Sequence, residues 1–401
     1  MLLLTMICYL FFYTGRHNFG WAAKQLAITL RISYEKVGWI SFAMLVGYAV
    51  GQFINGNLAD RVSPRHMIAT GGLLSVCANV LISFSDSFTV ILILWTLNGY
   101  FQSMAWASGS RIISNWWGSR NRGLAFGLYT MAAGASSIVT YLLSILLVHE
   151  GWRNLFRLPV LFLAGAVVVF FIFVRNKPSD LGFANEEEAD TAKQDWKYAY
   201  KVVLSNRRFL IVCLSLGFQS MARYGLIFWV PLFFQSRHAG HSFDIWITLL
   251  LPIGMAVGAL SFGFISDKVF NANRIKSITL GMSCCAFVSL LLFMFPLQNP
   301  ILVGFFVFCA GFFAYGPQAN FWPLSPELLG HQLVGTGTGV MNMCAYTFAA
   351  LGEPLMGKLI DMTSNKAVIF VVVAVIALLS ALTILLTNLV KRDSYVAGAA
   401  L

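Results

Sequence analysis

The sequence predicts an all-α membrane protein with twelve transmembrane helices in two pseudo-symmetric six-helix bundles. Of its 401 residues, 58% are hydrophobic and 11% are charged, whereas ordinary soluble domains carry about 25% charged residues. Apolar stretches long enough to cross a hydrocarbon core of about 30 Å recur along the whole chain. Because these stretches are continuous and lack the period-two alternation of barrel strands, we expect helices.

Short polar breaks separate the apolar stretches and define the expected spans. The expected spans are 1–26, 36–59, 67–85, 88–113, 123–148, 155–174, 209–235, 243–265, 277–296, 300–325, 333–360 and 366–390. Residues 1–174 would form the N-terminal bundle and residues 209–401 the C-terminal bundle. Residues 175–208 are the one long polar stretch, and we expect them to be a cytoplasmic linker.

The basic residues are distributed in a way that indicates membrane topology. The net charge is +11, but the basic residues form no single patch or nucleic-acid-binding motif, so no nucleic-acid partner is expected. They fall in alternate loops instead, as at Arg61, Arg120 and Lys268. Because cytoplasmic loops carry an excess of Lys and Arg, we expect an integral protein of the lipid bilayer with both termini in the cytoplasm.

The sequence contains no motif for catalysis or for a cofactor. Seven cysteines lie scattered in apolar segments, without the spacing of metal ligands or of a disulfide framework. No phosphate-binding loop, nucleophile elbow or metal motif occurs. We therefore expect no cofactor, no metal and no enzymatic activity.

The two halves of the chain carry the same features at one constant offset. The segment GNLADR follows the second span and GFISDK follows the eighth, and their aspartates, Asp60 and Asp267, are 267 − 60 = 207 positions apart. Arg16 and Arg223 lie in the middle of the first and seventh spans, and 223 − 16 is also 207. Transporters built from repeats hold their substrate near the midplane at the repeat interface. We therefore predict a central site flanked by both arginines.

Arg16 and Arg223 are costly residues at these positions. A charged side chain at the centre of a transmembrane helix costs roughly 2.5 to 3.5 kcal/mol on insertion scales. A guanidinium is always charged, and its planar fork matches the paired oxygens of phosphate, sulfonate or carboxylate. We interpret both arginines as ligands of a small organic anion. The alternative is that each pairs with a carboxylate or a carbonyl for packing alone.

Several motifs are similar to those of a known family. GNLADRVSPRH at residues 56–66, with its second copy GFISDK, resembles the loop signature of the major facilitator superfamily. Within that superfamily the chain resembles the organophosphate:phosphate antiporters, which carry glycerol-3-phosphate and hexose phosphates. The similar stretches are LNGYFQSMAWASGSRIISNWW (97–117) with Arg120 and Arg122–Gly123, then RYG (223–225), SDKVF (266–270), YGP (315–317) and GT (335–336).

The resemblance implies two bundles that rock about a central site and exchange an external organic phosphate for internal inorganic phosphate. In that family one arginine of the first helix and one of the seventh hold the phosphoryl group, and they correspond to Arg16 and Arg223. A tyrosine one turn before the first arginine corresponds to Tyr13, and its seventh-helix counterpart is Ser220. By the same resemblance we expect a monomer in the bacterial inner (plasma) membrane.

The chain departs from the family at three positions. Where members commonly have a lysine directly after the first arginine, this chain has His17, and it has Gln52 in place of a cavity lysine. The fifth-helix histidine of the glycerol-3-phosphate carriers is Ala133 here. A site with fewer cations neutralises less charge, which disfavours a dianionic sugar phosphate and favours a phosphonate, sulfonate or carboxylate.

Glu353 is the one carboxylate that we place deep in the membrane, and it is followed by Pro354. It could be structural, satisfying amides that the proline frees or pairing with an arginine. Alternatively it is a protonation site that couples protons to transport. His17 could share the coupling role because imidazole titrates near neutral pH, although the neighbouring Arg16 would keep it neutral.

Other side chains are expected to line the cavity or to gate it. For any single aromatic residue, helix packing or the interfacial belt is an alternative. The expected lining residues are Tyr13, His17, Gln52, Gln102, Trp106, Tyr224, Trp229, Tyr315, Gln318 and Asn320. Asp60 and Asp267, with Arg120, are expected to gate, because a carboxylate at a helix end can engage a neighbouring helix or arginine in one state only.

Three functions remain open from the sequence. The first is exchange of an organic anion for inorganic phosphate by alternating access. The second is proton-coupled symport of an organic anion, which the missing lysines and Glu353 favour. The third is a membrane receptor that keeps the fold, binds a sugar phosphate and signals to a partner kinase.

Overall fold

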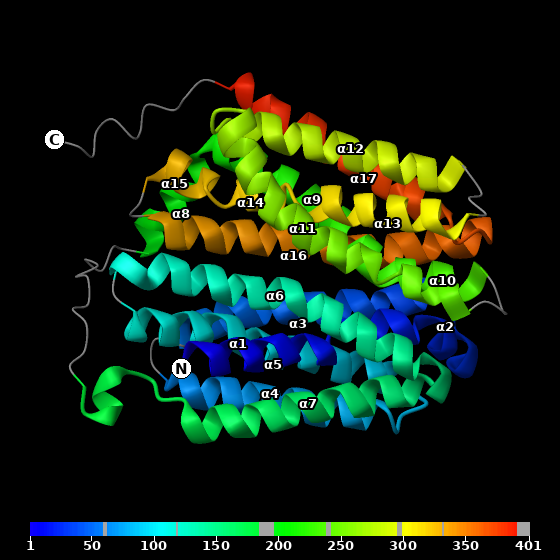
Figure 1. Ribbon diagram of the computed structural model, residues 1–401, viewed down its shortest axis with the longest axis horizontal. Coiled ribbons are helices and arrows are strands. Elements are labelled where there is room, and N and C mark those ends of the chain that lie inside the picture. Colours follow the sequence, from blue (N-terminus) through cyan, green and yellow to red (C-terminus); the bar gives the residue numbers. More distant parts are fainter. Residues whose placement is uncertain are drawn as a thin grey trace. The chain divides into compact units, whose positions relative to one another are not determined.

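The computed structural model describes residues 1–58, 62–117, 119–183, 196–237, 242–294, 299–330 and 333–390. All regular secondary structure in these ranges is helical (Figure 1), so the predicted fold class is confirmed. Two compact units divide the chain: Met1–Ala189 with Phe234–Arg237, and Asp190–Phe233 with His238–Leu401. Our separation of residues 175–208 as a linker stays a prediction.

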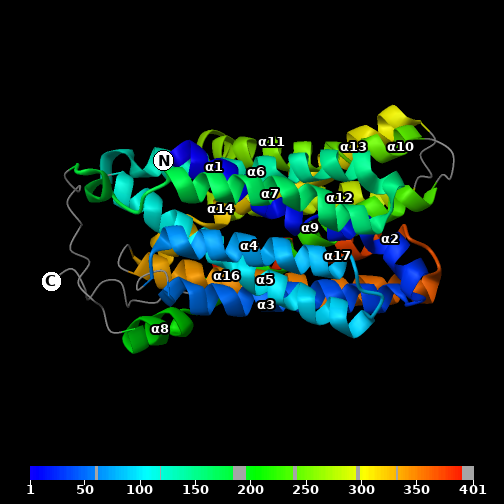
Figure 2. The ribbon, with the colours of Figure 1, turned by 90° about the horizontal axis from the view of Figure 1, so that it is seen from below.

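The first unit consists of long helices that run side by side (Figure 2). Within it α3 packs along α5, α4 packs against α5 and α7, and α1 contacts α6 and α7. Its elements are α1 (Leu2–Phe12), η1 (Tyr13–Gly15), α2 (Phe19–Leu30), α3 (Tyr34–Leu58), α4 (Pro64–Ile82), α5 (Phe88–Trp116), α6 (Ser119–Leu147), η2 (Val148–Glu150), α7 (Trp152–Phe173) and η3 (Pro178–Leu181).

The second unit repeats this pattern of packing. Here α11 packs along α13, α12 packs against α13 and α17, and α8 contacts α16. Its elements are α8 (Trp196–Ser205), α9 (Arg207–Arg237, whose last residues group with the first unit), α10 (Ser242–Ile247), α11 (Leu250–Phe264), η4 (Ile265–Val269), α12 (Arg274–Met294), α13 (Pro300–Tyr315), α14 (Gln318–Phe321), α15 (Leu324–Leu329), α16 (Val334–Thr363), α17 (Val368–Leu385) and η6 (Leu386–Asn388).

Glycines set the close approach of α3 to α5 and of α11 to α13. A Cβ on Gly47 would lie 2.2 Å from the carbonyl oxygen of Thr96, and one on Gly254 would lie 2.1 Å from that of Phe308. Small residues at such contacts let two membrane helices approach backbone to backbone. The two glycines are 254 − 47 = 207 positions apart, so the structure adds a further feature at the offset found in the sequence.

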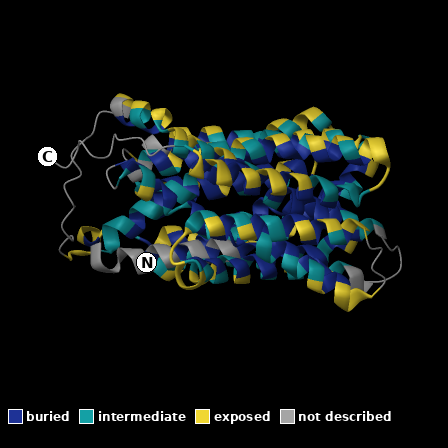
Figure 3. Ribbon diagram, turned by 90° about the horizontal axis from the view of Figure 1, so that it is seen from above, coloured by how far each residue is buried: buried dark blue, intermediate teal, exposed yellow. Residues whose placement is uncertain are grey.

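Nine helical segments among the described residues are long and apolar enough to cross a membrane. They correspond to nine of our predicted spans, and the other three predicted spans lie on α1–α2, α6 and α16. Exposed residues recur along the outer faces of the helices (Figure 3) and include large apolar side chains such as Leu161, Leu260 and Phe264, which are 59%, 74% and 65% exposed. Lipid-facing surfaces have this composition, because lipid tails are as apolar as leucine.

Three predicted spans are interrupted rather than continuous. The first is broken at residues 16–18, the eighth between α10 and α11, and the tenth after α13 at Gly316–Pro317. Irregular backbone at membrane depth is tolerated only where protein groups or a water-filled cavity satisfy it. The breaks in the first and tenth spans lie at candidate site residues.

Candidate functional site

The first span changes from helix to turn at Arg16. α1 continues into η1, which ends at Gly15, and α2 begins at Phe19. Arg16 itself has φ −133° and ψ −49°, which is not helical. Backbone carbonyls next to such a break lose their helical donors and need other donors inside the membrane. The packing of neighbouring helices must therefore supply them.

Side chains of α5 bond the carbonyl oxygens at the break. Asn98 Nδ2 donates to Gly15 O at 2.8 Å, and Gln102 Nε2 donates to Phe12 O at 2.8 Å. Asn79 Nδ2 of α4 lies 3.2 Å from the same Gly15 oxygen. Gln102, which we expected to line the cavity, is 3% exposed. In this structure its amide braces the helix that carries Arg16.

A second set of bonds fastens the break to α7. Pro159 lies inside α7 and has no N–H, so the carbonyl of Leu155, four residues earlier, lacks its helical donor. Asn18 Nδ2 donates to that oxygen at 2.9 Å, and Thr14 Oγ1 donates to Pro159 O at 3.0 Å. Side chains on both sides of Arg16 thus donate to carbonyl oxygens near the proline of α7, and the two irregular segments are joined by these hydrogen bonds.

The polar residues around the break form a pattern in the sequence that our predictions did not use. Ser75 and Asn79 lie one turn apart on α4, and Asn98 and Gln102 lie one turn apart on α5. Ser75 Oγ donates to Asn98 Oδ1 at 2.6 Å and accepts from Gln102 Nε2 at 2.9 Å. Because polar residues four positions apart lie on the same face of a helix, these two pairs inside apolar spans could have predicted the network.

The Arg16 guanidinium lies against two tyrosine rings. Its Cζ is 4.3 Å from the ring centroid of Tyr48 and 5.1 Å from that of Tyr13, and Arg16 is 6% exposed. A cation over an aromatic face is stabilised by the ring quadrupole. Tyr13 was among our predicted ligands, but Tyr48 of α3 was missed. The sequence feature that could have predicted Tyr48 is its position one helical turn before Gln52, which is half-buried on the same helix.

His17 and the neighbouring aromatic residues extend this cluster. His17 is 8% exposed and its Nδ1 lies 3.2 Å from Ser137 Oγ of α6, while its ring meets that of Tyr13 edge-on at 5.0 Å. Trp106, a predicted lining residue, is half-buried and contacts Tyr9 at 5.6 Å between centroids, and Tyr9 in turn meets Tyr13 at 5.5 Å. The structure therefore brings four predicted residues, Tyr13, Arg16, His17 and Trp106, into one connected set. The side chain of Ala133 lies outside the described residues.

Arg223 has a similar aromatic environment in the second unit. Its Cζ lies 4.5 Å from the ring centroid of Tyr224 and 5.0 Å from that of Tyr315, and both tyrosines were predicted. Tyr315 is the last residue of α13, directly before the break at Gly316–Pro317. Gln219 Nε2 of α9 donates to Ala314 O at 2.6 Å, so the arginine-bearing helix is fastened to that break.

The remaining predicted polar residues of the tenth span also lie near this break. Asn320 is fully buried, and its Nδ2 lies 2.9 Å from Ser277 Oγ and 3.2 Å from Phe262 O. Gln318 is half-buried at the start of α14. Ser220 Oγ lies 3.3 Å from the side-chain oxygen of its neighbour Gln219. Our assignment of Gln318 and Asn320 to the cavity lining stays a prediction.

Glu353 lies inside α16 and is 1% exposed. The indole N–H of Trp229, which is fully buried on α9, approaches its carboxyl group. Its Oε2 has no hydrogen-bond partner among the described residues. Trp229 follows Arg223 by six residues, which is about 9 Å along a helix axis. A buried carboxyl group and an arginine therefore lie at different depths of the same unit.

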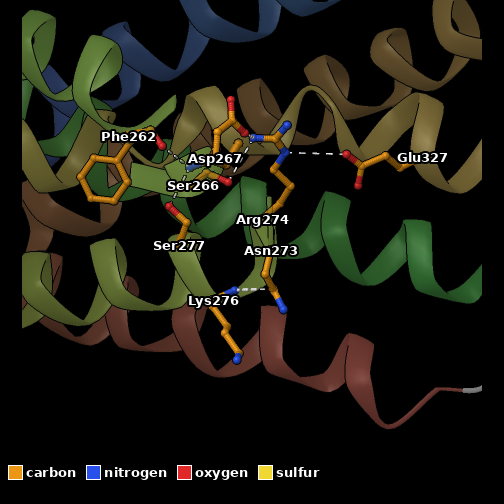
Figure 4. Close-up of polar contacts among 9 residues, drawn as sticks. Phe262, Ser266, Asp267, Asn273, Arg274, Lys276, Ser277 and Glu327 are labelled. Atoms are coloured by element: carbon orange, nitrogen blue, oxygen red, sulfur yellow. Dashed lines mark hydrogen bonds and ion pairs between the residues drawn. The ribbon is translucent and has the colours of Figure 1, made fainter. Parts of the chain in front are cut away.

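The predicted gate residue Asp267 belongs to an ion-pair cluster (Figure 4). Arg274 Nη1 lies 2.5 Å from Asp267 Oδ1 and 3.0 Å from Ser266 Oγ, and Arg274 Nε lies 3.7 Å from Glu327 Oε1 of α15. Arg274 thus joins η4 to α15. Neither it nor Glu327 was predicted as a gate residue. Asp60 and the side chain of Arg120 lie outside the described residues.

Comparison with known proteins identifies the family. Residues 5–353 match the Major Facilitator Superfamily. The chain is 24% identical over 384 residues to a probable hexose phosphate transport protein of Chlamydia pneumoniae, covering 90% of this chain and 84% of the relative. It is 25% identical over 381 residues to the glycerol-3-phosphate transporter of Bacillus subtilis (88% and 84%). Its identity to the membrane sensor protein UhpC of Escherichia coli is 25% over 406 residues (96% and 91%).

Solved structures agree on the fold. A bacterial homologue of the lysosomal transporter Spinster, in an inward-facing and unoccupied conformation, aligns with a TM-score of 0.80 at 15% identity, covering 96% of this chain and 97% of that one. A point mutant of the nucleoside transporter NupG aligns with a TM-score of 0.76 at 13% identity (96% and 99%). The chain therefore belongs to the Major Facilitator Superfamily, a family of membrane transporters rather than enzymes, and has the fold of that family.

Proposed function

We propose that this chain carries a small organic anion across the membrane by alternating access, with Arg16 and Arg223 as the ligands of that anion. The observation that carries the proposal is the shared geometry of the two arginines. Each guanidinium lies over two tyrosine rings, at 4.3 and 5.1 Å for Arg16 and at 4.5 and 5.0 Å for Arg223. Aromatic rings next to a guanidinium hold it in place, and the N–H groups of a guanidinium bind the paired oxygens of an oxyanion.

The substrate that we propose is an organic phosphate or a similar anion. Its support is the set of relatives, which are described as carriers of hexose phosphate, glycerol-3-phosphate and phosphoglycerate. These compounds share a phosphoryl group on a small organic body, and the planar fork of arginine matches phosphate oxygens. Exchange for inorganic phosphate on the opposite side is the coupling that follows from this resemblance.

The positions that differ from the family favour a substrate of low charge within this class. His17 and Gln52 stand where the resemblance leads us to expect lysines. The formal charges of the two proposed ligands, Arg16 and Arg223, and of Glu353 sum to +1 when Glu353 is ionised. A phosphonate, sulfonate or carboxylate matches this sum better than a dianionic sugar phosphate does.

Proton coupling is a second candidate, and Glu353 is the observation that favours it. The carboxyl group is 1% exposed and one of its oxygens has no hydrogen-bond partner in the described part of the chain. An ionisable residue inside the membrane is a functional-site hypothesis by default. In this mechanism a proton on Glu353 would enter with the anion, and no phosphate would be exchanged. His17 stays a second candidate for that proton.

A receptor is a third candidate, because one relative that the chain covers almost entirely is a membrane sensor protein. Such a protein would bind its ligand without moving useful amounts of it. Ligand binding to the folded state raises apparent stability, by about 2.7 kcal/mol at a concentration of one hundred times the dissociation constant. A ligand that raises the stability of the protein but is not taken up would therefore identify a receptor.

Reconstituted vesicles separate the three candidates. The purified full chain is first screened by thermal shift against phosphate, sugar phosphates, phosphonates, sulfonates and carboxylates, and the best ligand is then tested for uptake. We expect uptake that requires internal inorganic phosphate and that persists without a pH gradient. Uptake that requires an inward proton gradient and ignores internal phosphate would establish symport instead. A thermal shift with no uptake under either condition would identify a receptor.

A further inference from the structure

The short helix α8 (Trp196–Ser205) has one face against the protein and one face outside it. Ala199 and Val203, which are 5% and 0% exposed, lie one turn apart, and α8 contacts α16 of the same unit (Figure 1). Lys197, Lys201 and Leu204 follow the spacing i, i+4, i+7 and are all exposed, with Leu204 50% exposed. Because this spacing places residues on one side of a helix, α8 is a basic amphipathic helix.

The position of α8 is fixed by the residue that follows it. Asn206 Oδ1 accepts a hydrogen bond from the backbone N–H of Phe209 at 3.0 Å, which caps the start of α9. Asn206 Nδ2 also donates to Leu328 O at 3.2 Å. The membrane-spanning part of α9 begins at Arg207. α8 is therefore held at the boundary of the membrane, directly before a span.

All charged residues from α8 to the start of α9 are basic, and Asp195 directly precedes this segment. Residues 196–210 contain Lys197, Lys201, Arg207 and Arg208 and no acidic residue. Arg208 is used inside the unit, where its Nε donates to Thr387 O and Val390 O at 3.1 and 2.9 Å. Lys197, Lys201 and Arg207 are exposed. We call these three residues, together with Leu204, the α8 basic face.

We propose that the α8 basic face binds the anionic headgroups of phospholipids, with α8 lying in the membrane interface. The apolar face of α8 packs against the protein, so we expect its outer face to meet the interface, with Leu204 at the acyl boundary and the basic groups at the phosphates. Each lysine or arginine near an anionic surface contributes attraction that falls off within a Debye length. The long side chains reach the headgroups while their methylene stems stay against apolar surface.

The exposed leucines favour lipid over an acidic protein partner. Leu204 on α8 is 50% exposed and Leu210, one turn into the membrane span of α9, is 38% exposed. Both lie close in sequence to the exposed lysines and to Arg207. A surface that combines cations with apolar side chains at the edge of a span matches a phospholipid, which presents a phosphate next to hydrocarbon. The proposal does not depend on which anion the protein transports.

Hydrogen exchange in nanodiscs tests the proposal. The full chain is placed in phosphatidylcholine alone or in phosphatidylcholine with about one-third phosphatidylglycerol, and amide exchange of residues 199–205 is measured. We expect phosphatidylglycerol to slow exchange there, by about five-fold for each engaged lysine, and added salt to reduce this effect. In K197Q/K201Q the slowing should be lost, while exchange in α9 and the melting temperature in phosphatidylcholine stay unchanged.

The matched control replaces two exposed lysines outside α8 by glutamine. Lys268 and Lys276 are exposed near the start of α12, and K268Q/K276Q should keep the full response of α8 to phosphatidylglycerol. Equal exchange of the wild-type α8 in both lipid mixtures would overturn the proposal. So would slowing by phosphatidylglycerol that survives in K197Q/K201Q, or that is lost equally in the control. Protection of α8 only in native membranes, and never by phosphatidylglycerol, would point to a protein partner instead.

Discussion

The side-chain amide of Asn98 donates a 2.8 Å hydrogen bond to the carbonyl oxygen of Gly15, the residue immediately before Arg16. Asn98 is fully buried, so this bond is made where no water can replace it. It connects α5 to the one point at which the first span stops being helical. The conformation of the proposed anion ligand is thus set by a residue that need not touch the anion.

Replacing Asn98 by Leu tests this dependence. The change removes the donor to Gly15 O, which keeps the longer bond from Asn79 at 3.2 Å, and it also removes the acceptor of Ser75 Oγ. A buried polar group that loses its partner costs about 1 to 3 kcal/mol, so the melting temperature should fall. Substrate affinity should fall with it, because Arg16 loses its fixed backbone. Unchanged stability and affinity in Asn98→Leu would show that the bond is not needed.

The proposed ligand role of the arginines predicts that charge alone is not sufficient. Arg16→Lys and Arg223→Lys keep a cation but lose the planar fork. Loss of one charge-assisted hydrogen bond is worth about 1.5 to 3 kcal/mol, which corresponds to roughly a ten- to hundred-fold weaker apparent affinity for the anion. Uptake as a function of substrate concentration measures this. Arg31, an exposed arginine at the end of α2, supplies the matched control, and Arg31→Lys should transport normally. Full activity in Arg223→Lys would contradict bidentate capture.

Tyr48 is expected to act through its ring and not through its hydroxyl. Its centroid lies 4.3 Å from the Arg16 guanidinium carbon, and a desolvated cation–π contact is worth about 2 kcal/mol. Tyr48→Phe keeps the ring and should retain most of the substrate affinity. Tyr48→Ala loses that contact and should weaken affinity several-fold to about thirty-fold. Equal affinities of the Phe and Ala variants would mean that the ring does not position Arg16.

Much of the architecture could be predicted from the sequence, because hydropathy and repetition are local signals. Arg16 and Arg223 mark an offset of 207, and the structure shows why the offset extends to Gly47 and Gly254. Both glycines admit a neighbouring backbone at just over 2 Å from where a Cβ would stand. A repeat that preserves a helix contact must preserve the small residue at that contact.

The site was less predictable, because it depends on which helices pack together. No proline marks the break at residues 16–18, and the 2.8 Å bonds that satisfy it come from α5, more than eighty positions away. Tyr48 is an ordinary aromatic residue until α3 is placed beside the first span. In contrast, the break in the tenth span is marked by Gly316–Pro317, because proline lacks the N–H that a continuing helix needs. α8 lies in the segment that we expected to be a linker.

The coupling role of Glu353 gives the last prediction. Its carboxyl group is buried in α16 against Trp229, six residues beyond Arg223 on α9. An ionised carboxylate there would oppose an anionic substrate, and a proton would remove that charge while leaving both arginines able to bind. Transport should therefore rise as the external pH falls, and Glu353→Gln should bind the anion with a flattened pH profile. Proteoliposome uptake measured across a pH series checks both expectations.

The structural alternative for Glu353 predicts a different outcome from the same variant. If the carboxylate is a buried ion partner, Glu353→Gln leaves an uncompensated cation and costs about 3 to 5 kcal/mol. The folded yield and the melting temperature would then fall sharply. Glu150→Gln, on an exposed carboxylate in η2, controls for loss of a charge outside the predicted spans. A pH profile of uptake that is identical in wild type and in well-folded Glu353→Gln would exclude coupling through this residue.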